Sequence, residues 1–351
     1  MEFEFANAGS RTHEFGNMAK SAVEKAREQV GMVVGADKSD VVFTSGATEA
    51  NNMAILGLEK HANEVERRHI ITSAIEHKAV LEPIEELERR GFDVTVLKPD
   101  ERGVVDSGDL RDALTDDTIL VSLMQVNNET GVIQPIADYV AALEVHDAYF
   151  HVDAAQGYGK EIEGLLNSRI DLISCSAHKL YGPKGVGALI ARRRKYKRPP
   201  LEPLMFGGGQ ERGLRPGTLP VHQIAGFGVA AEIARRDYRQ RKEACSKIKQ
   251  AALSAFDDLP VKYHGTSDVL ASTLNLSIPG VNSEAAIVAL KGIAAVSNGS
   301  ACTSSSYTPS HVLQAMGLDD DEVEGALRFS WCHMTGDVPW GEIAYRLESL
   351  R

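Results

Sequence analysis

The chain has 351 residues, of which 43% are hydrophobic and 25% charged, and its formal net charge is -11 at pH 7. This composition permits a large core and excludes the broad basic field that nucleic-acid binding requires. No apolar run approaches the roughly 20 residues of a membrane-spanning helix, and four cysteines without a secretory leader predict a cytoplasmic protein with no disulfide framework.

The first informative segment is residues 41–57, where a short strand meets a small-residue turn and then a helical pattern. Ser45, Gly46 and Ala47 would leave backbone N–H groups free at the helix start, and Thr48 would add a hydroxyl. The segment predicts an anion cradle, although an ordinary N-cap has a similar sequence.

Strand-like and helical stretches alternate as far as about Ala191. Alternation of this kind predicts a mostly parallel sheet wrapped by helices, which is an α/β fold. Further strands are expected at residues 70–74, 93–97, 118–123 and 185–190.

An acidic residue closes the next strand-like run, because the aromatic and β-branched residues 149–152 lead directly into Asp153. An Asp in this place commonly opens a turn or caps a helix. A carboxylate there could instead keep the ring nitrogen of a pyridoxal 5'-phosphate (PLP) cofactor protonated.

Lys179 follows the apolar run 171–176 and precedes a glycine-rich turn. A lysine that ends a buried strand loses hydration, and its neutral amine can form a Schiff base with an aldehyde cofactor such as PLP. The alternative is a solvated loop lysine beside Tyr181 and Lys184. Strand ends of a parallel sheet gather at one edge, which favours a site shared by Lys179 and Asp153.

The C-terminal part predicts a second, smaller α/β domain. A long helical region at residues 221–256, broken once, precedes a strand at 272–278 and a helix at 283–290. We expect residues 1–225 to form the large domain and residues 226–351 the small one. The basic cluster at 192–198 is expected to be a solvated loop, with a docking patch for an acidic partner as the alternative.

Taken together, several segments resemble the cysteine desulfurases of the class V aminotransferase superfamily, PLP enzymes of fold type I. The resemblance covers nearly the whole chain and implies a mostly parallel seven-stranded sheet. The matching segments are residues 45–49, 76–77, 126–131, 151–156, 176–185, 210–221 and 297–304.

Carried over to this sequence, the resemblance implies Lys179 as the Schiff-base lysine and Asp153 as the partner of the pyridine nitrogen. His77 would stack on the ring and take part in proton transfer. Gln156 and Asn128 would meet the phenolic oxygen of the cofactor.

The resemblance also implies a phosphate site made of Ala47 (through its N–H), Thr48, Ser176 and His178. Thr218 would reach the phosphate of the neighbouring subunit, so a homodimer is implied. No metal is expected, because the four cysteines lack metal-ligand spacing.

For the substrate, the resemblance implies that Arg328, together with Asn128, binds the α-carboxylate. A surface ion pair is the alternative for Arg328. Cys302 lies in a run of small polar residues, 297–306, without strand or helix periodicity, and would take sulfur from L-cysteine as a persulfide, leaving L-alanine. Cys175, Cys245 and Cys332 are expected to be structural.

The sulfur would pass to a protein acceptor in iron-sulfur cluster assembly, tRNA thiolation or DNA phosphorothioation. Two other functions stay open: a related PLP enzyme, such as a selenocysteine lyase or an aminotransferase, and a non-catalytic sulfur-transfer scaffold. The sequence departs from the family in lacking its usual N-terminal strand with the pattern Asp-x-Ala-Ala-Thr-Thr-Pro, and in carrying His333 where relatives often have Gly-Arg.

Overall fold

The computed structural model describes residues 6–10, 12–266, 268–298 and 309–351, and it confirms the predicted α/β fold. Within these residues one large sheet is mostly parallel: β7 runs antiparallel to both of its neighbours, and the remaining pairs are parallel. Its seven strands lie in the order β1 (Val41–Thr44), β7 (Gly187–Ala191), β6 (Leu172–Ser176), β5 (Tyr149–Asp153), β4 (Thr118–Met124), β2 (His69–Ser73) and β3 (Asp93–Leu97).

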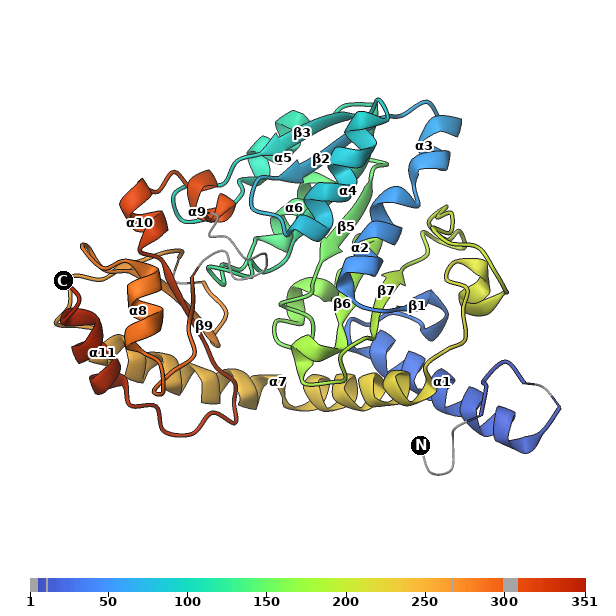
Figure 1. Cartoon of the computed structure of the whole chain (residues 1–351). Coiled ribbons are helices and arrows are strands. Elements are labelled where there is room, and N and C mark those ends of the chain that lie inside the picture. The colour runs from blue at the N-terminus through green and yellow to red at the C-terminus, as the bar shows by residue number, and fades with distance from the viewer. Residues whose placement is uncertain (1–5, 11, 267, 299–308) are drawn as a thin grey trace.

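Helices cover both faces of this sheet, because successive side chains of a strand point to opposite faces. Val42 packs with residues of α2 and α4, whereas Val41 and Phe43 pack with residues of α1 and α7 (Figure 1). The helices of this part are α1 (Glu14–Val33), α2 (Ala47–Leu56), α3 (Glu59–Glu64), α4 (Lys78–Arg89), α5 (Ser107–Ala113), α6 (Ile136–Ala142) and α7 (Val221–Ala255).

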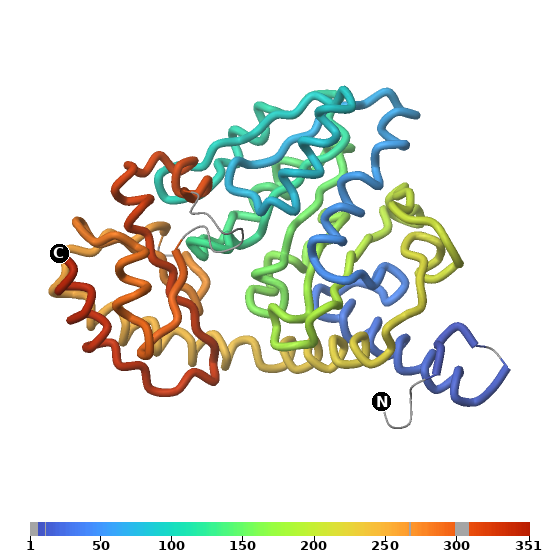
Figure 2. The backbone as a smooth tube through the Cα atoms, viewed as in Figure 1, coloured from blue at the N-terminus to red at the C-terminus, as the bar shows by residue number. Residues whose placement is uncertain are grey.

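The expected break in the long helical region is wrong, because α7 is one helix of 35 residues. Two glycines near the start of α7, Gly226 and Gly228, permit close packing against neighbouring segments and do not break the helix. A Cβ added to Gly228 would lie 2.6 Å from the Cα of Ala26 on α1, and one added to Gly226 would lie 2.7 Å from Cγ of Pro183. Figure 2 shows α7 running from beneath the large sheet to the C-terminal part of the chain.

A second, antiparallel sheet lies at the far end of α7. Its order is β10 (Ser297–Asn298), β11 (Leu327–Ser330), β9 (Thr273–Ser277) and β8 (Lys262–Tyr263). The sequence predicts no strand or helix in residues 297–306. The first two of these residues nevertheless form β10, since Ser297 pairs with Arg328. The helices here are α8 (Ser283–Ala289), α9 (His311–Ala315), α10 (Asp320–Glu324) and α11 (Trp340–Glu348).

A separate aromatic cluster, which includes Phe256, Phe329 and Trp340, holds α7 and α11 against the second sheet. The expected domain boundary lies between residues 225 and 226. It stays a prediction, because one continuous helix, α7, crosses it. The two sheets nevertheless have separate hydrophobic clusters.

The basic cluster at 192–198 is only partly the solvated loop that the sequence predicted. Arg192 is buried and donates to the carbonyl oxygens of Asn167 and Leu165. Arg194 makes an ion pair with Asp171 at 2.6 Å. These arginines therefore fasten the end of β7 to neighbouring loops.

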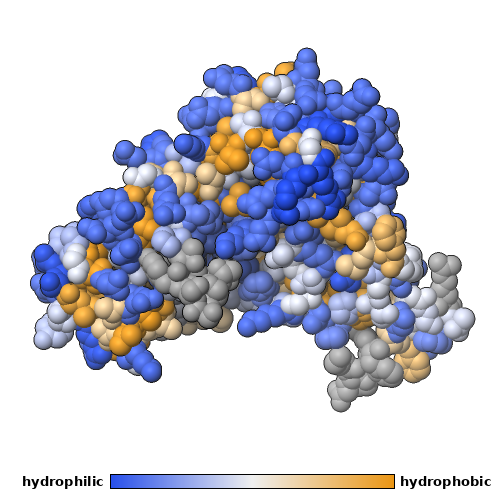
Figure 3. Space-filling model, turned by 45° about the horizontal axis from the view of Figure 1, so that its top comes forward, coloured by the Kyte–Doolittle hydropathy of each residue, from blue (hydrophilic) through white to orange (hydrophobic). Residues whose placement is uncertain are grey.

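The face shown in Figure 3 is mostly hydrophilic, with separate apolar patches. In the described part of the chain, no helix combines the length and the apolar character that crossing a bilayer requires.

Candidate active site

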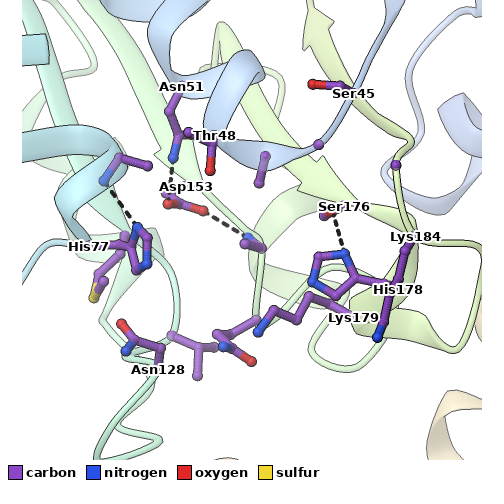
Figure 4. Close-up of a pocket in the computed structure, with 18 of the residues that line it drawn as sticks. Ser45, Thr48, Asn51, His77, Asn128, Asp153, Ser176, His178, Lys179 and Lys184 are labelled. Atoms are coloured by element: carbon purple, nitrogen blue, oxygen red, sulfur yellow. Dashed lines mark hydrogen bonds between the residues drawn. The ribbon is translucent and has the colours of Figure 1, made fainter. Parts of the chain in front are cut away.

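A cavity of about 530 Å³ lies at the carboxyl edge of the large sheet, within the size range of small-molecule sites (Figure 4). It brings together every predicted site residue in the described part of the chain except Thr218. The predicted residues that line it are Ala47, Thr48, His77, Asn128, Asp153, Gln156, Ser176, His178, Lys179 and Arg328.

Asp153 ends β5 and is buried at the floor of this cavity. Its Oδ2 accepts a hydrogen bond from Nδ2 of Asn51 at 2.7 Å, and its Oδ1 accepts one from the N–H of Ala155 at 2.9 Å. Burial raises the pKa of Asp153, while these hydrogen bonds and the charges of His77 and Lys179 act in the opposite direction. A cation placed against this carboxylate would favour its ionised form.

Lys179 lies in a single 3-10 turn, Ala177–Leu180, that follows β6. The turn ends at Tyr181, whose left-handed φ of 68° reverses the chain. Because β5 and β6 are adjacent and parallel, the residues after them meet at one edge. In Figure 4 the side chain of Lys179 enters the space that Asp153 also faces.

One end of the cavity is suited to an anion. Ala47 and Thr48 form the first turn of α2, where backbone N–H groups lack helical partners. The N-cap Gly46 lies so close to Gly187 of β7 that a Cβ on Gly187 would be 2.7 Å from the Cα of Gly46. Beside them, Oγ of Ser176 lies 2.9 Å from Nδ1 of His178.

The imidazole of His178 is disposed to be neutral. Burial lowers its pKa, and the nearby charges of Lys179 and Lys184 lower it further. A neutral ring with one N–H can donate a hydrogen bond to an anion while its other nitrogen faces Ser176.

The opposite end of the cavity joins the two sheets. His77 caps α4, and its Nδ1 accepts a hydrogen bond from the N–H of Ala79 at 3.0 Å, which fixes the ring. Arg328, from β11, donates through Nη1 to the carbonyl oxygen of Asn128 at 2.8 Å. Nε of Arg328 is buried and has no partner among the described residues, so the guanidinium can still bind an anionic ligand.

Sequence reasoning missed several residues of this site. Asn51 follows Ala47 by one helical turn and thus shares its face of α2, a signal that could have identified it. Lys184 also lines the cavity. For Glu76, the only feature of the sequence that pointed to the site was its place directly before His77.

Glu76 is a buried carboxyl group just outside the cavity lining. It accepts hydrogen bonds from the N–H of Met124 at 2.8 Å and from Oγ of Ser73 at 2.6 Å. Burial, together with the charge of Asp153, raises its pKa to about 8. Glu76 is therefore mostly protonated at neutral pH.

Thr218 is exposed and does not line the cavity. Its segment is anchored by Glu211, whose buried carboxylate makes a bidentate ion pair with Arg27, at 2.7 and 2.8 Å, and accepts the N–H of Phe43 at 2.8 Å. The φ of Glu211 is 47°, which is an uncommon conformation for this residue type.

Cys302 lies outside the described residues, so its role is still a prediction. Of the other cysteines, Cys175 and Cys245 are buried and Cys332 is half-buried. Among the described side chains, no group of three or more His, Cys, Asp or Glu is arranged to hold a metal ion.

Comparison with known proteins agrees with this arrangement. The family model described as Aminotransferase class-V matches residues 2–337. The cysteine desulfurase IscS of Vibrio cholerae is 46% identical over 353 aligned positions, which cover 100% of this chain and 86% of that protein.

Two solved structures are also similar. DndA from Streptomyces lividans is 48% identical, with a TM-score of 0.83 over 94% of this chain and 92% of that one. SspA in complex with cysteine is 38% identical, with a TM-score of 0.81 over 93% of this chain and 91% of that one. The chain therefore belongs to the aminotransferase class-V family and, within it, to the cysteine desulfurases.

Proposed function

We propose that the protein binds PLP in the cavity and converts L-cysteine to L-alanine, with transfer of sulfur to Cys302 as a persulfide. The observation that carries this proposal is the approach of Lys179 and Asp153 to one cavity from adjacent parallel strands. A cysteine desulfurase needs both an amine and an acid beside the pyridine ring of its cofactor.

The residues present fit the cofactor. Asp153 is a buried acid without an ion-pair partner among the described residues, and a protonated ring nitrogen would supply the missing positive charge. The N-terminal turn of α2, with Ser176 and His178, offers donors for a phosphate. Asn128 and Gln156 are the candidates for the phenolic oxygen, and His77 for the ring face.

When bound, PLP would draw electrons from the substrate Cα. Arg328 would bind the substrate carboxylate through its planar guanidinium. Nζ of Lys179 would then accept the proton from Cα, and His77 would assist proton transfer. The thiolate of Cys302 would attack the sulfur of the substrate. The electron pair of the Cβ–S bond would stay on Cβ, which would take up a proton to become the methyl group of alanine, while the sulfur remains on Cys302 as a persulfide.

We further propose that two copies of the chain form a homodimer in the cytoplasm. Thr218 is exposed and does not line its own cavity, which agrees with a role at the phosphate of a neighbour. The preceding segment exposes Phe206 (89%) and Met205 (44%), apolar side chains that a second copy would cover. Sedimentation at several concentrations tests the dimer.

A protein acceptor is proposed to receive the sulfur, for iron-sulfur cluster assembly, tRNA thiolation or DNA phosphorothioation. Copurification of the protein with its acceptor decides among these pathways.

The decisive experiment supplies L-cysteine to the PLP-loaded protein and measures alanine and sulfide in the presence of a thiol. Equal amounts of both products are expected. Lys179→Ala should abolish turnover and the visible absorbance of the bound cofactor, and Cys302→Ala should abolish persulfide while keeping the absorbance. Unchanged colour and turnover in Lys179→Ala would refute the proposal.

A further inference from the structure

Asn51 is a buried amide of α2 that lines the cavity and to which the proposed mechanism gives no role. Only 1% of its surface is exposed. The other buried residues of this helix are all apolar: Ala50, Met53, Ala54 and Ile55. Because a buried amide destabilises a protein unless it makes hydrogen bonds, an asparagine at this position needs a reason other than packing.

The hydrogen bond of this amide supplies the reason. Nδ2 of Asn51 donates to Oδ2 of Asp153 at 2.7 Å, and the contact is drawn in Figure 4. Oδ1 of Asn51 is buried and has no partner among the described residues. The bond to Asp153 is therefore the contact that explains a polar side chain at this place in the helix.

The neighbouring asparagine of α2 makes a different kind of contact. Nδ2 of Asn52 donates at 2.9 Å to the carbonyl oxygen of Thr48, four residues earlier in the same helix, and this bond is exposed. Asn51 instead reaches the end of β5, 102 residues later in the chain. It therefore connects the helix that begins at the proposed phosphate site to the carboxylate proposed for the ring nitrogen.

The carboxylate of Asp153 is held through both of its oxygens. Oδ2 accepts the amide of Asn51, and Oδ1 accepts the N–H of Ala155 at 2.9 Å. These two donors fix the orientation of the group and favour its ionised form, because an ionised carboxylate only accepts hydrogen bonds. Burial raises the pKa of Asp153, and both hydrogen bonds act in the opposite direction.

We propose that Asn51 is a positioning residue that keeps Asp153 ionised and oriented toward the ring nitrogen of the cofactor. A proton shared between Asp153 and this nitrogen can lie on either group. A donor to the carboxylate favours the arrangement in which the nitrogen carries the proton, and PLP needs this form to draw electrons from the substrate. The inference rests on the proposed function, because it takes the cavity as the PLP site.

The carbocyclic analogue of PLP, in which C–H replaces the ring nitrogen, is a suitable probe. It keeps the aldehyde, the hydroxyl group and the phosphate, so it differs from PLP only at the atom that Asp153 would meet. Equilibrium titration of the cofactor-free protein with each ligand gives two dissociation constants, and their ratio measures the preference for PLP. The wild type should prefer PLP, because the analogue leaves Asp153 buried without a cation.

Asn51→Leu removes the donor and keeps a similar side-chain volume. We expect the preference for PLP to fall about tenfold, because a hydrogen bond to a charged group changes an equilibrium constant by about this factor or more. Affinity for the analogue should stay close to the wild-type value. Asn51→Ala should lose less of the preference, because water can enter the vacated space and donate to Asp153. A purely structural role would weaken the binding of both ligands equally.

A double variant shows whether Asn51 acts through Asp153. Asp153→Asn alone should lose most of the preference for PLP, and adding Asn51→Leu to it should reduce the preference no further. Asn52→Leu is the matched control, because it removes an exposed amide from the same helix. It should keep the wild-type ratio of dissociation constants.

Three results would overturn the inference: a wild-type ratio in both Asn51→Leu and Asn51→Ala, an equal loss of affinity for the two ligands, or a further fall of the ratio in the double variant. Failure of the proposed function would give different results. The wild type would then bind PLP no more tightly than the analogue, or Asp153→Asn would keep the full preference.

Discussion

The two ends of the cavity are constructed differently. The end proposed to bind the cofactor phosphate (the phosphate end) is formed within the large sheet, by the first turn of α2 and by the residues that follow β6. Its donors are backbone N–H groups and the short side chains of Thr48, Ser176 and His178. Such a site is determined by local backbone geometry and close packing.

The end proposed to bind the substrate carboxylate (the carboxylate end) requires both sheets. Arg328 belongs to β11, whereas Asn128, whose carbonyl it contacts, follows β4 about 200 residues earlier in the chain. Glu129, the residue after Asn128, is buried and has a raised pKa. The comparison indicates that cofactor affinity should depend on packing at one end and that substrate affinity should depend on charge at the other.

The largest expected effect concerns the buried ion pair that supports the phosphate end. Glu211→Ala would leave Arg27 buried with only the more exposed Glu24 as an ion-pair partner and would free the N–H of Phe43 in β1. Loss of one member of a buried pair costs about 3–5 kcal/mol of the free energy of unfolding. Urea unfolding measures this loss.

The control for Glu211→Ala is Glu202→Ala, which removes an exposed ion pair with Lys60. Its effect should stay below about 1 kcal/mol. Equal effects of the two substitutions would mean that the buried pair does not support this region.

Arg328→Ala should separate the two ends by function. Removing a charged hydrogen-bonding group from the carboxylate end should cost about 3 kcal/mol of transition-state binding, so kcat/KM for L-cysteine should fall about 100-fold. Cofactor affinity, measured by equilibrium titration with PLP, should stay within about twofold of the wild type. A parallel loss of cofactor affinity would show that the ends are not independent.

Gly187→Ala tests the phosphate end by packing alone. Its new Cβ would lie 2.7 Å from the Cα of Gly46 and 2.5 Å from the carbonyl oxygen of Cys175, so the start of α2 must shift. Overpacking of this kind costs about 1–3 kcal/mol, and we expect PLP to bind about tenfold more weakly.

Gly341→Ala is the matched control for Gly187→Ala, because nothing lies within 4 Å of its added Cβ and it sits in α11. It should leave PLP affinity unchanged. Equal PLP affinity in both variants would argue against a tightly packed cradle.

The sequence predicted the meeting of residues at the edge of the large sheet, for a physical reason. Asp153 and Lys179 each follow an apolar run, and parallel strands bring such ends together without knowledge of distant contacts. Asn51 was missed although helical spacing from Ala47 could have identified it. The motif at 45–48 likewise depends only on neighbours in the chain.

The contacts made at the carboxylate end were not predicted, because they depend on register and burial. Neither the pairing of Arg328 with Asn275 nor the contact between Glu129 and Ser310 follows from periodicity. The expected break in α7 was wrong for a related reason: Gly228 serves close packing against α1, which a single sequence does not reveal. Burial likewise determines the ionisation of Glu76.

The last expected effect is a pH dependence from Glu76, the buried carboxyl group just outside the cavity lining. Its pKa is about 8 in the folded protein and near 4.5 when unfolded, so unfolding releases a proton between these values. The stabilisation is full below pH 4.5 and is lost as pH rises through 8. The free energy of unfolding should therefore fall by about 1.4 kcal/mol per pH unit from this group.

Glu76→Gln removes this proton while it keeps an oxygen for the N–H of Met124 and the hydroxyl of Ser73. Urea unfolding between pH 5.5 and 7.5 gives the free energy of unfolding at each pH. As pH rises, this free energy should fall less steeply in the variant than in the wild type, by about 1.4 kcal/mol per pH unit. Glu202→Gln, which changes an exposed carboxylate, should leave the slope unaltered. If the free energy of unfolding falls equally with pH in wild type and Glu76→Gln, Glu76 is ionised in the folded protein. It would then be a second buried negative charge that interacts with Asp153, which burial disfavours.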